Sequence, residues 1–138
     1  MAQILVIDDT QGRLDWFQDV LEPLGHDVRL AYDATQALEQ FSESEFDLAF
    51  FDHDLGIGMN GSQLAFEVLN NPEDFKPPKA VWIHTSNTVG ACNIEAKFNS
   101  ARIRCHVEPF ESCMRSKLDF VAVVASFLAN VPTESAND

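Results

Sequence analysis

The stretch FDLAFFDHDLGIGMNG, residues 46–61, joins a hydrophobic run to an acidic segment that contains three glycines. Residues 48–51 are apolar and lie between two aspartates, which is typical of a short strand buried on both faces of a parallel sheet. Asp52, His53 and Asp54 follow where that strand ends, and the glycines after them let the chain turn closely past a ligand. The stretch therefore predicts a central buried strand that carries an acidic side chain to the edge of a sheet.

Four further runs that read as strands alternate with helical patterns along the chain. The runs are QILVI at residues 3–7, HDVRLA at 26–31, AVWIHT at 80–85 and RIRCHV at 102–107. Apolar residues recur at helical spacing over residues 13–24, 34–41, 62–69, 87–98 and 118–128. Because parallel strands are joined by crossover helices, this alternation predicts a doubly wound, five-stranded parallel α/β sheet in three layers. We expect one domain over residues 1–130 and a flexible tail over residues 131–138.

The charge of the chain argues against several classes of partner. Nine lysine and arginine residues against 22 aspartate and glutamate residues give a net charge of 9 − 22 = −13 at pH 7. A surface this negative repels nucleic acid and anionic membranes, so we expect neither duplex DNA binding nor membrane attachment. If the chain acts on RNA, its negative charge favours contact with the end of the RNA over contact with a long stretch of it.

The cysteines and the N-terminus indicate where the protein is found. Cys92, Cys105 and Cys113 form an odd set without C-x-x-C spacing, which argues against a disulfide framework or a thiolate zinc site. The N-terminal residues MAQILVIDD reach acid without a basic flank or a cleavable apolar segment. These features predict a cytoplasmic protein with reduced thiols.

Acidic residues follow two of the predicted strands. Asp8 and Asp9 come after the first strand and Asp52 after the third. In doubly wound sheets these two strands are commonly neighbours, and ligands bind outside the carboxyl ends of the strands. Three carboxylates in one small cleft repel one another, and a hard divalent cation with oxygen ligands stabilises them. We therefore expect Asp8, Asp9 and Asp52 to hold Mg²⁺ or Mn²⁺.

The strand ends together carry a recognisable pattern. The first strand ends in two acids, the third in LAFFD before a glycine loop, the fourth in a threonine and the fifth in E-P-F. Along essentially its whole length the chain resembles the CheY-like receiver domains, which have a flavodoxin-like fold. The resemblance implies that Asp8 and Asp9 bind Mg²⁺, that Asp52 is a phosphoacceptor and that Thr85 contacts the phosphoryl group. It further implies that Asp54 offers its main-chain carbonyl to the metal and that a sensor kinase is the partner.

Glu108 departs from the receiver pattern, because receivers carry lysine at that position, before the proline. A glutamate repels phosphoryl oxygens or takes a metal, and at about 4 Å and an effective dielectric of about 20 the change of sign amounts to several kcal/mol. Glu108 can equally be a solvated acid beside a proline turn.

Two further motifs add chemical groups to the same rim. D-H-D-L-G begins at Asp52, and H-T-S-N-T-V-G begins at His84. Together they resemble a receiver-like variant family, the cyclic-phosphate-processing receivers. The resemblance implies a metal-dependent phosphodiesterase or phosphohydrolase that acts on a cyclic phosphate or a related phosphate ester.

The residue types of these motifs suit the opening of a cyclic phosphodiester. That reaction needs an activated water, a proton for the leaving alkoxide and positive charge near the phosphoryl oxygens. Histidines exchange protons near neutral pH, so His53 and His84 are candidates for acid and base, with Asp54 or Asp52 orienting one of them. Asp54 can equally be an acid that shapes the glycine turn. Thr85, Ser86 and Asn87 are candidate donors to phosphate oxygens, and Asn87 is also a candidate helix cap.

Three functions remain open at this point. The first is an enzyme that hydrolyses a small cyclic phosphate or an RNA end. The second is a stand-alone receiver that a sensor kinase phosphorylates at Asp52. The third is a pseudo-receiver that acts only by protein contact.

Overall fold

A computed structural model of the chain describes residues 1–130. Its centre is a parallel sheet of five strands in the order β2-β1-β3-β4-β5. The strands are β1 (Gln3–Ile7), β2 (Asp27–Ala31), β3 (Leu48–Phe51), β4 (Ala80–Ile83) and β5 (Arg104–Val107). Strand order reverses between β1 and β3, which pair in register from Ile4 opposite Leu48 to Ile7 opposite Phe51. The predicted doubly wound sheet is confirmed, and its switch point lies where the acidic strand ends meet.

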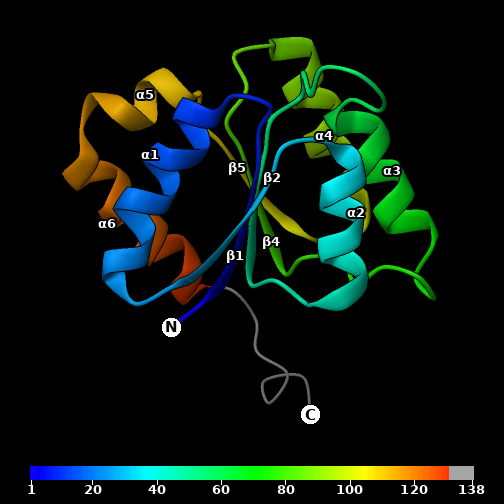
Figure 1. Cartoon of the computed structure of the whole chain (residues 1–138), viewed down its shortest axis with the longest axis horizontal. Helices are drawn as coiled ribbons and strands as arrows, with labels where there is room; N and C mark the ends of the chain where they lie inside the picture. The colour runs from blue at the N-terminus through cyan, green and yellow to red at the C-terminus, as the bar shows by residue number, and fades with distance from the viewer. Residues whose placement is uncertain (131–138) are drawn as a thin grey trace.

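Helices cover both faces of the sheet. On one face lie α1 (Gln11–Leu21), α5 (Phe110–Arg115) and α6 (Lys117–Ala129), and on the other lie α2 (Ala34–Glu43), α3 (Gly61–Asn70) and α4 (Thr88–Ser100) (Figure 1). The strands run in the same direction, so β1 leads into the start of α1 at the rim where α4 also begins (Figure 1). Each face therefore contributes a helix N-terminus to the rim that carries the candidate residues.

Two hydrophobic cores lie on the two faces of the sheet. Phe51, Phe41 and Phe98 belong to the core under α2, α3 and α4. Phe17, Phe50 and Trp82 belong to the core under α1, α5 and α6. Phe50 and Phe51 are neighbours in β3 and point to opposite faces, which explains why this strand is apolar throughout. Both layers thus fix the backbone that ends in Asp52.

The helices differ from the sequence-based prediction in two places. The first helical pattern is interrupted, because α1 ends at Leu21 and a 3₁₀ turn, η1 (Glu22–Leu24), contains Pro23 and closes on Gly25 at φ 93°. The short helix α5 was not predicted. Its only buried residues are Phe110 and Cys113, too few to form a visible period, and Ser116 then caps α6. The tail expected over residues 131–138 lies outside the described residues.

No helix within residues 1–130 combines the length and apolarity that crossing a membrane requires. The expected cytoplasmic location stays a prediction.

Candidate functional site

Three buried side chains meet at the carboxyl ends of the central strands. Asp8 follows β1, Asp52 follows β3 and His84 follows β4. One ligand atom from each lies within 4.8 Å of those from the other two, and all three residues are buried. Main-chain bonds extend the sheet into this cluster, from the Asp52 amide to the Ile7 carbonyl and from the His84 amide to that of Phe51. The cluster is therefore held by the sheet itself.

Asp8 and His84 form a buried carboxylate–imidazole pair. His84 Nε2 lies 2.8 Å from Asp8 Oδ2, and the other carboxylate oxygen accepts a hydrogen bond from the Thr10 amide at 2.8 Å. Among the described residues, the buried Nδ1 of His84 has no hydrogen-bond partner. A proton on Nε2, donated to Asp8, suits these contacts because it leaves Nδ1 a lone pair instead of an unsatisfied N–H. His84 thus orients Asp8.

Asp52 is 3% exposed. Burial raises the pKa of its carboxyl above the ordinary value, although the neighbouring His84 lowers it; Asp8 raises it further, and Arg13 lowers it. Its Oδ1 accepts a hydrogen bond from the His53 amide at 2.8 Å. An ionised Asp52 therefore needs a cation nearby.

Arg13 supplies positive charge beside both buried carboxylates. Its Nη1 lies 3.8 Å from Asp8 Oδ2 and 3.8 Å from Asp52 Oδ2. The guanidinium also lies 5.3 Å from the centre of the Phe110 ring and 3.9 Å from a carboxylate oxygen of Glu111. Arg13 was not predicted. The available signal was its place in the first turn of the helix that starts at the rim, four residues after Asp9.

His53 forms a second carboxylate–imidazole pair nearer to solvent. Its Nδ1 lies 3.1 Å from Asp54 Oδ1 and 3.3 Å from the side-chain nitrogen of Asn87. Asn87 also caps α4, because its side-chain oxygen accepts a hydrogen bond from the Gly90 amide at 2.9 Å. The Asp54 side chain is 71% exposed, whereas that of His53 is 14% exposed. His53 is therefore held in place but lies close to solvent.

Two glycines let α3 and α4 approach this pair. A Cβ on Gly90 would overlap His53 Cγ, and one on Gly61 would overlap the Asp52 carbonyl oxygen. Real Cβ atoms do not come so close to other atoms. Glycine at both positions is thus required for the observed packing around His53.

The other predicted site residues lie at different depths. Asp9 is exposed beside the glycine loop and outside the cluster of three ligand atoms. Thr85 is buried, and its hydroxyl accepts a hydrogen bond from the Asn87 amide at 3.1 Å. Ser86 is exposed at the same rim. The metal role of Asp9 and the phosphate-binding roles of Thr85, Ser86 and Asn87 stay predictions.

Glu108 has protein partners of its own. One carboxylate oxygen lies 3.1 Å from His106 Nε2, and the other accepts a hydrogen bond from the Ser112 hydroxyl at 3.4 Å. The Glu108 amide donates to the Ile83 carbonyl, which ties this residue to the end of β4. At the position where receivers carry lysine, this chain has Glu108, whose partners lie in β5 and α5. The positive charge beside Asp52 comes instead from Arg13 in α1.

This arrangement places groups that bind cations beside groups that bind anions. Asp8 and Asp52 offer carboxylate oxygens close to one another, which is the donor set that a hard divalent ion prefers. Arg13 offers a guanidinium that matches phosphate oxygens in shape and charge. The two histidines lie at different depths, and each is paired with a carboxylate.

Solved structures of response regulators share this fold. A CheY-like receiver from Methanospirillum hungatei JF-1 is 21% identical with a TM-score of 0.69, and the match covers 94% of each chain. The response regulator TrrA from Thermotoga maritima, solved in complex with Mg²⁺ and BeF, is 19% identical with a TM-score of 0.67 over 93% of this chain and 99% of that one. A response regulator from Burkholderia pseudomallei was solved with a phosphorylated aspartic acid, calcium and citrate. It is 21% identical with a TM-score of 0.64, over 99% of this chain and 70% of that one.

Family membership follows from the sequence. None of the curated proteins matches this chain. Residues 3–100 match a family described as the cyclic-phosphate processing receiver domain, a span that runs from β1 to the end of α4 and includes both carboxylate–imidazole pairs and Arg13. The chain belongs to this family of receiver domains.

Proposed function

We propose that this receiver-fold chain opens a cyclic phosphodiester and releases a phosphate monoester. The observation that carries the proposal is the contact of Arg13 with both Asp8 and Asp52, at 3.8 Å each, beside two histidines that are each paired with a carboxylate. A guanidinium at this place offsets the negative charge that develops on phosphoryl oxygens. The imidazole side chains of the two histidines then transfer protons at neutral pH.

The residues have separate roles in this proposal. A water oxygen attacks phosphorus and one ring P–O bond breaks, so that the leaving alkoxide takes a proton and the water loses one. His53, near solvent and oriented by Asp54, exchanges the proton with the reacting atoms. His84 is 1% exposed and acts through Asp8, whose carboxylate it orients. Asn87 and Thr85 position the α4 N-terminus, where main-chain N–H groups favour an anion.

A divalent ion fits the donor set of this site. Asp8 and Asp52 would hold Mg²⁺ or Mn²⁺, with Asp9 at the exposed side; burial raises the pKa of Asp52, and a bound cation would offset that effect. When bound, such an ion supplies Lewis acidity and lowers the pKa of its water. TrrA, which shares this fold, was solved in complex with Mg²⁺ and BeF, and this agrees with the proposal of a divalent ion here.

A second function is favoured by the position of Asp52. It ends the central strand of a fold shared with response regulators, one of which was solved with a phosphorylated aspartic acid. In this alternative a sensor kinase phosphorylates Asp52, and Arg13 takes the charge-neutralising role that Glu108 cannot fill. A chain that neither turns over substrate nor accepts phosphate would act by protein contact alone.

Phosphorus NMR separates these functions. The protein with Mg²⁺ or Mn²⁺ is incubated with a panel of 2′,3′-cyclic nucleotides and, separately, with a small phosphodonor such as acetyl phosphate. Our proposal predicts turnover of a cyclic substrate that is lost in His53→Ala and Arg13→Met. A lasting aspartyl-phosphate signal without turnover of any cyclic substrate would establish the receiver function instead.

A further inference from the structure

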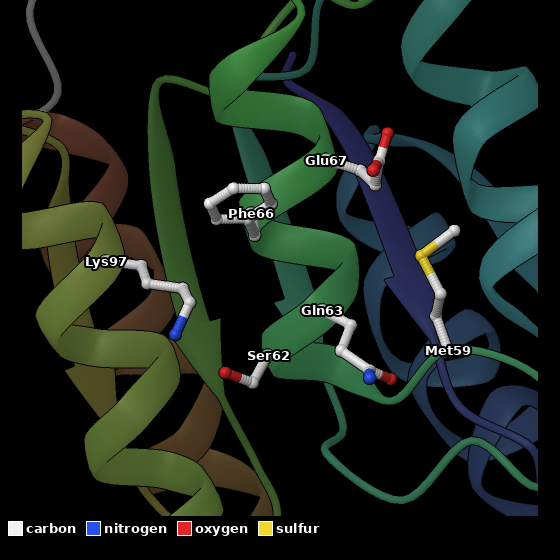
Figure 2. A pocket seen from close by; sticks show the side chains of 6 residues that line it. All are labelled: Met59, Ser62, Gln63, Phe66, Glu67 and Lys97. Atoms are coloured by element: carbon white, nitrogen blue, oxygen red, sulfur yellow. The ribbon is translucent and has the colours of Figure 1, made fainter.

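A groove between α3 and α4 lies beside the site described above. It has a volume of about 370 Å³ and is lined by Met59, Ser62, Gln63, Phe66, Glu67 and Lys97. Figure 2 shows the Lys97 side chain reaching from α4 toward the start of α3, where the Ser62 hydroxyl faces the same part of the groove. A groove of this size, with apolar side chains and a few polar groups, falls in the range of small-ligand sites.

Lys97 brings a positive charge into this groove. Within residues 1–130 the ion pairs of lysine involve Lys79, which contacts Glu45 and Asp47, and none involves Lys97. Glu67 lines the same groove, but its carboxylate accepts a hydrogen bond from the Asn71 side chain at 3.1 Å. In Figure 2, Glu67 and Lys97 extend on opposite sides of Phe66. An ammonium without an ion-pair partner among residues 1–130 can attract an anion, even in a chain of net charge −13.

Phe66 gives the groove an apolar wall. It is 53% exposed, although α3 is otherwise built with its apolar residues toward the core. A second hollow of about 340 Å³ shares Phe66 and Lys97 and continues past Leu69. The apolar surface on both sides of the Phe66 ring thus has room for an organic group attached to the anion.

The groove and the candidate site share backbone. Met59 belongs to the glycine loop that follows Asp54, and Ser62 follows Gly61, which packs against the carbonyl of Asp52. A ligand in contact with Met59 and Ser62 therefore touches the segment that carries His53.

We propose that the groove binds a small organic carboxylate. Its carboxylate pairs with the Lys97 ammonium and accepts a hydrogen bond from Ser62, and its apolar part packs on Phe66 and Met59. The charge of Lys97 selects the anion, and the exposed ring selects an aromatic or aliphatic body.

The test uses phenylacetate as the probe and phenylacetamide as its neutral counterpart. Each is titrated into the full chain labelled with ¹⁵N, and amide shifts are followed by NMR. We expect saturable shifts at Ser62, Phe66 and Lys97 with a Kd of about 1–10 mM for phenylacetate, since a ligand of this size reaches only millimolar affinity. Phenylacetamide should bind at least about tenfold more weakly, because it lacks the charge-assisted hydrogen bond.

Two substitutions of equal charge provide the control. Lys97→Met should weaken phenylacetate about tenfold, whereas Lys76→Met, at an exposed lysine away from the groove, should leave its Kd unchanged. Equal Kd values in the two variants, equal binding of the amide, or no saturable shift in the groove would each overturn the proposal. Tighter binding of the peptide acetyl-Gly-Gly-Phe than of phenylacetate would replace the small ligand with a peptide C-terminus.

Discussion

Replacing Gly90 with alanine perturbs the packing that holds His53 in place. A Cβ at this position would lie 2.6 Å from Cδ2 and 2.7 Å from Nδ1 of the His53 ring, and closer still to Cγ. Ordinary van der Waals contact begins at 3.4 Å, so the ring has to move by about 1 Å. That movement separates His53 from Asp54 and Asn87.

Opposing effects determine how much Gly90→Ala changes the free energy of unfolding. Alanine favours the helical conformation over glycine by about 0.5–1 kcal/mol. Overpacking a well-filled site costs about 1–3 kcal/mol, and the lost hydrogen bond between His53 and Asp54 costs about 0.5–1.5 kcal/mol more. We therefore expect Gly90→Ala to lower the free energy of unfolding by about 0.5–4 kcal/mol. Gly12 lies in α1, where a Cβ would meet no other atom within 4 Å, so Gly12→Ala should raise that energy by about 0.5–1 kcal/mol.

Urea unfolding of a double-mutant cycle measures the effect. In a His53→Ala background the ring is gone, and Gly90→Ala should become neutral or stabilising, with a coupling energy of about 1.5–4.5 kcal/mol from the overpacking and the hydrogen bond together. Additive behaviour of Gly90→Ala and His53→Ala, or a Gly90→Ala variant as stable as Gly12→Ala, would refute the packing argument.

Further predictions concern charge, thiols and capping. Because the pKa of Asp52 is raised, protonation stabilises the fold below the unfolded pKa, and that stability is lost as pH rises through the folded pKa. Asp52→Asn should thus raise the free energy of unfolding at pH 7 by about 0.5–2 kcal/mol, with a smaller gain near pH 3; urea unfolding at both pH values checks this. Cys92 is exposed, whereas burial raises the pKa of Cys105 and Cys113 to about 12, so a thiol reagent at pH 8 should label one cysteine quickly. Labelling of all three cysteines at equal rates would contradict this prediction. Asn60 forms a capping box with Gln63, so Asn60→Ala should cost about 1 kcal/mol in thermal unfolding, and no change would contradict the cap.

The fold could be predicted because each central strand is buried on both faces. An apolar run such as residues 48–51, followed by acids and glycines, has few possible structures other than a buried strand. The helices between the runs determine that the strands are parallel. The short helix α5 could not be predicted, since two buried residues three positions apart also suit a turn.

The candidate site was predictable only in part. Asp8, Asp52 and His84 follow strands whose ends meet, so topology alone brings them together. Arg13 belongs to a helix, and the direction of a long side chain from a first turn is not encoded in spacing. The departure at Glu108 was visible, but its hydrogen bonds to His106 and Ser112 depend on how β5 meets α5.

We propose that this receiver scaffold acts on a cyclic phosphate through Arg13 and His53. The most direct measurement is the phosphorus spectrum of a 2′,3′-cyclic nucleotide incubated with the protein and Mg²⁺, compared with Arg13→Met and with Glu108→Gln. We predict a monoester signal that grows with the unaltered protein and with Glu108→Gln and is absent with Arg13→Met. An unchanged cyclic phosphate with the unaltered protein, or equal turnover by Arg13→Met, would contradict the claim.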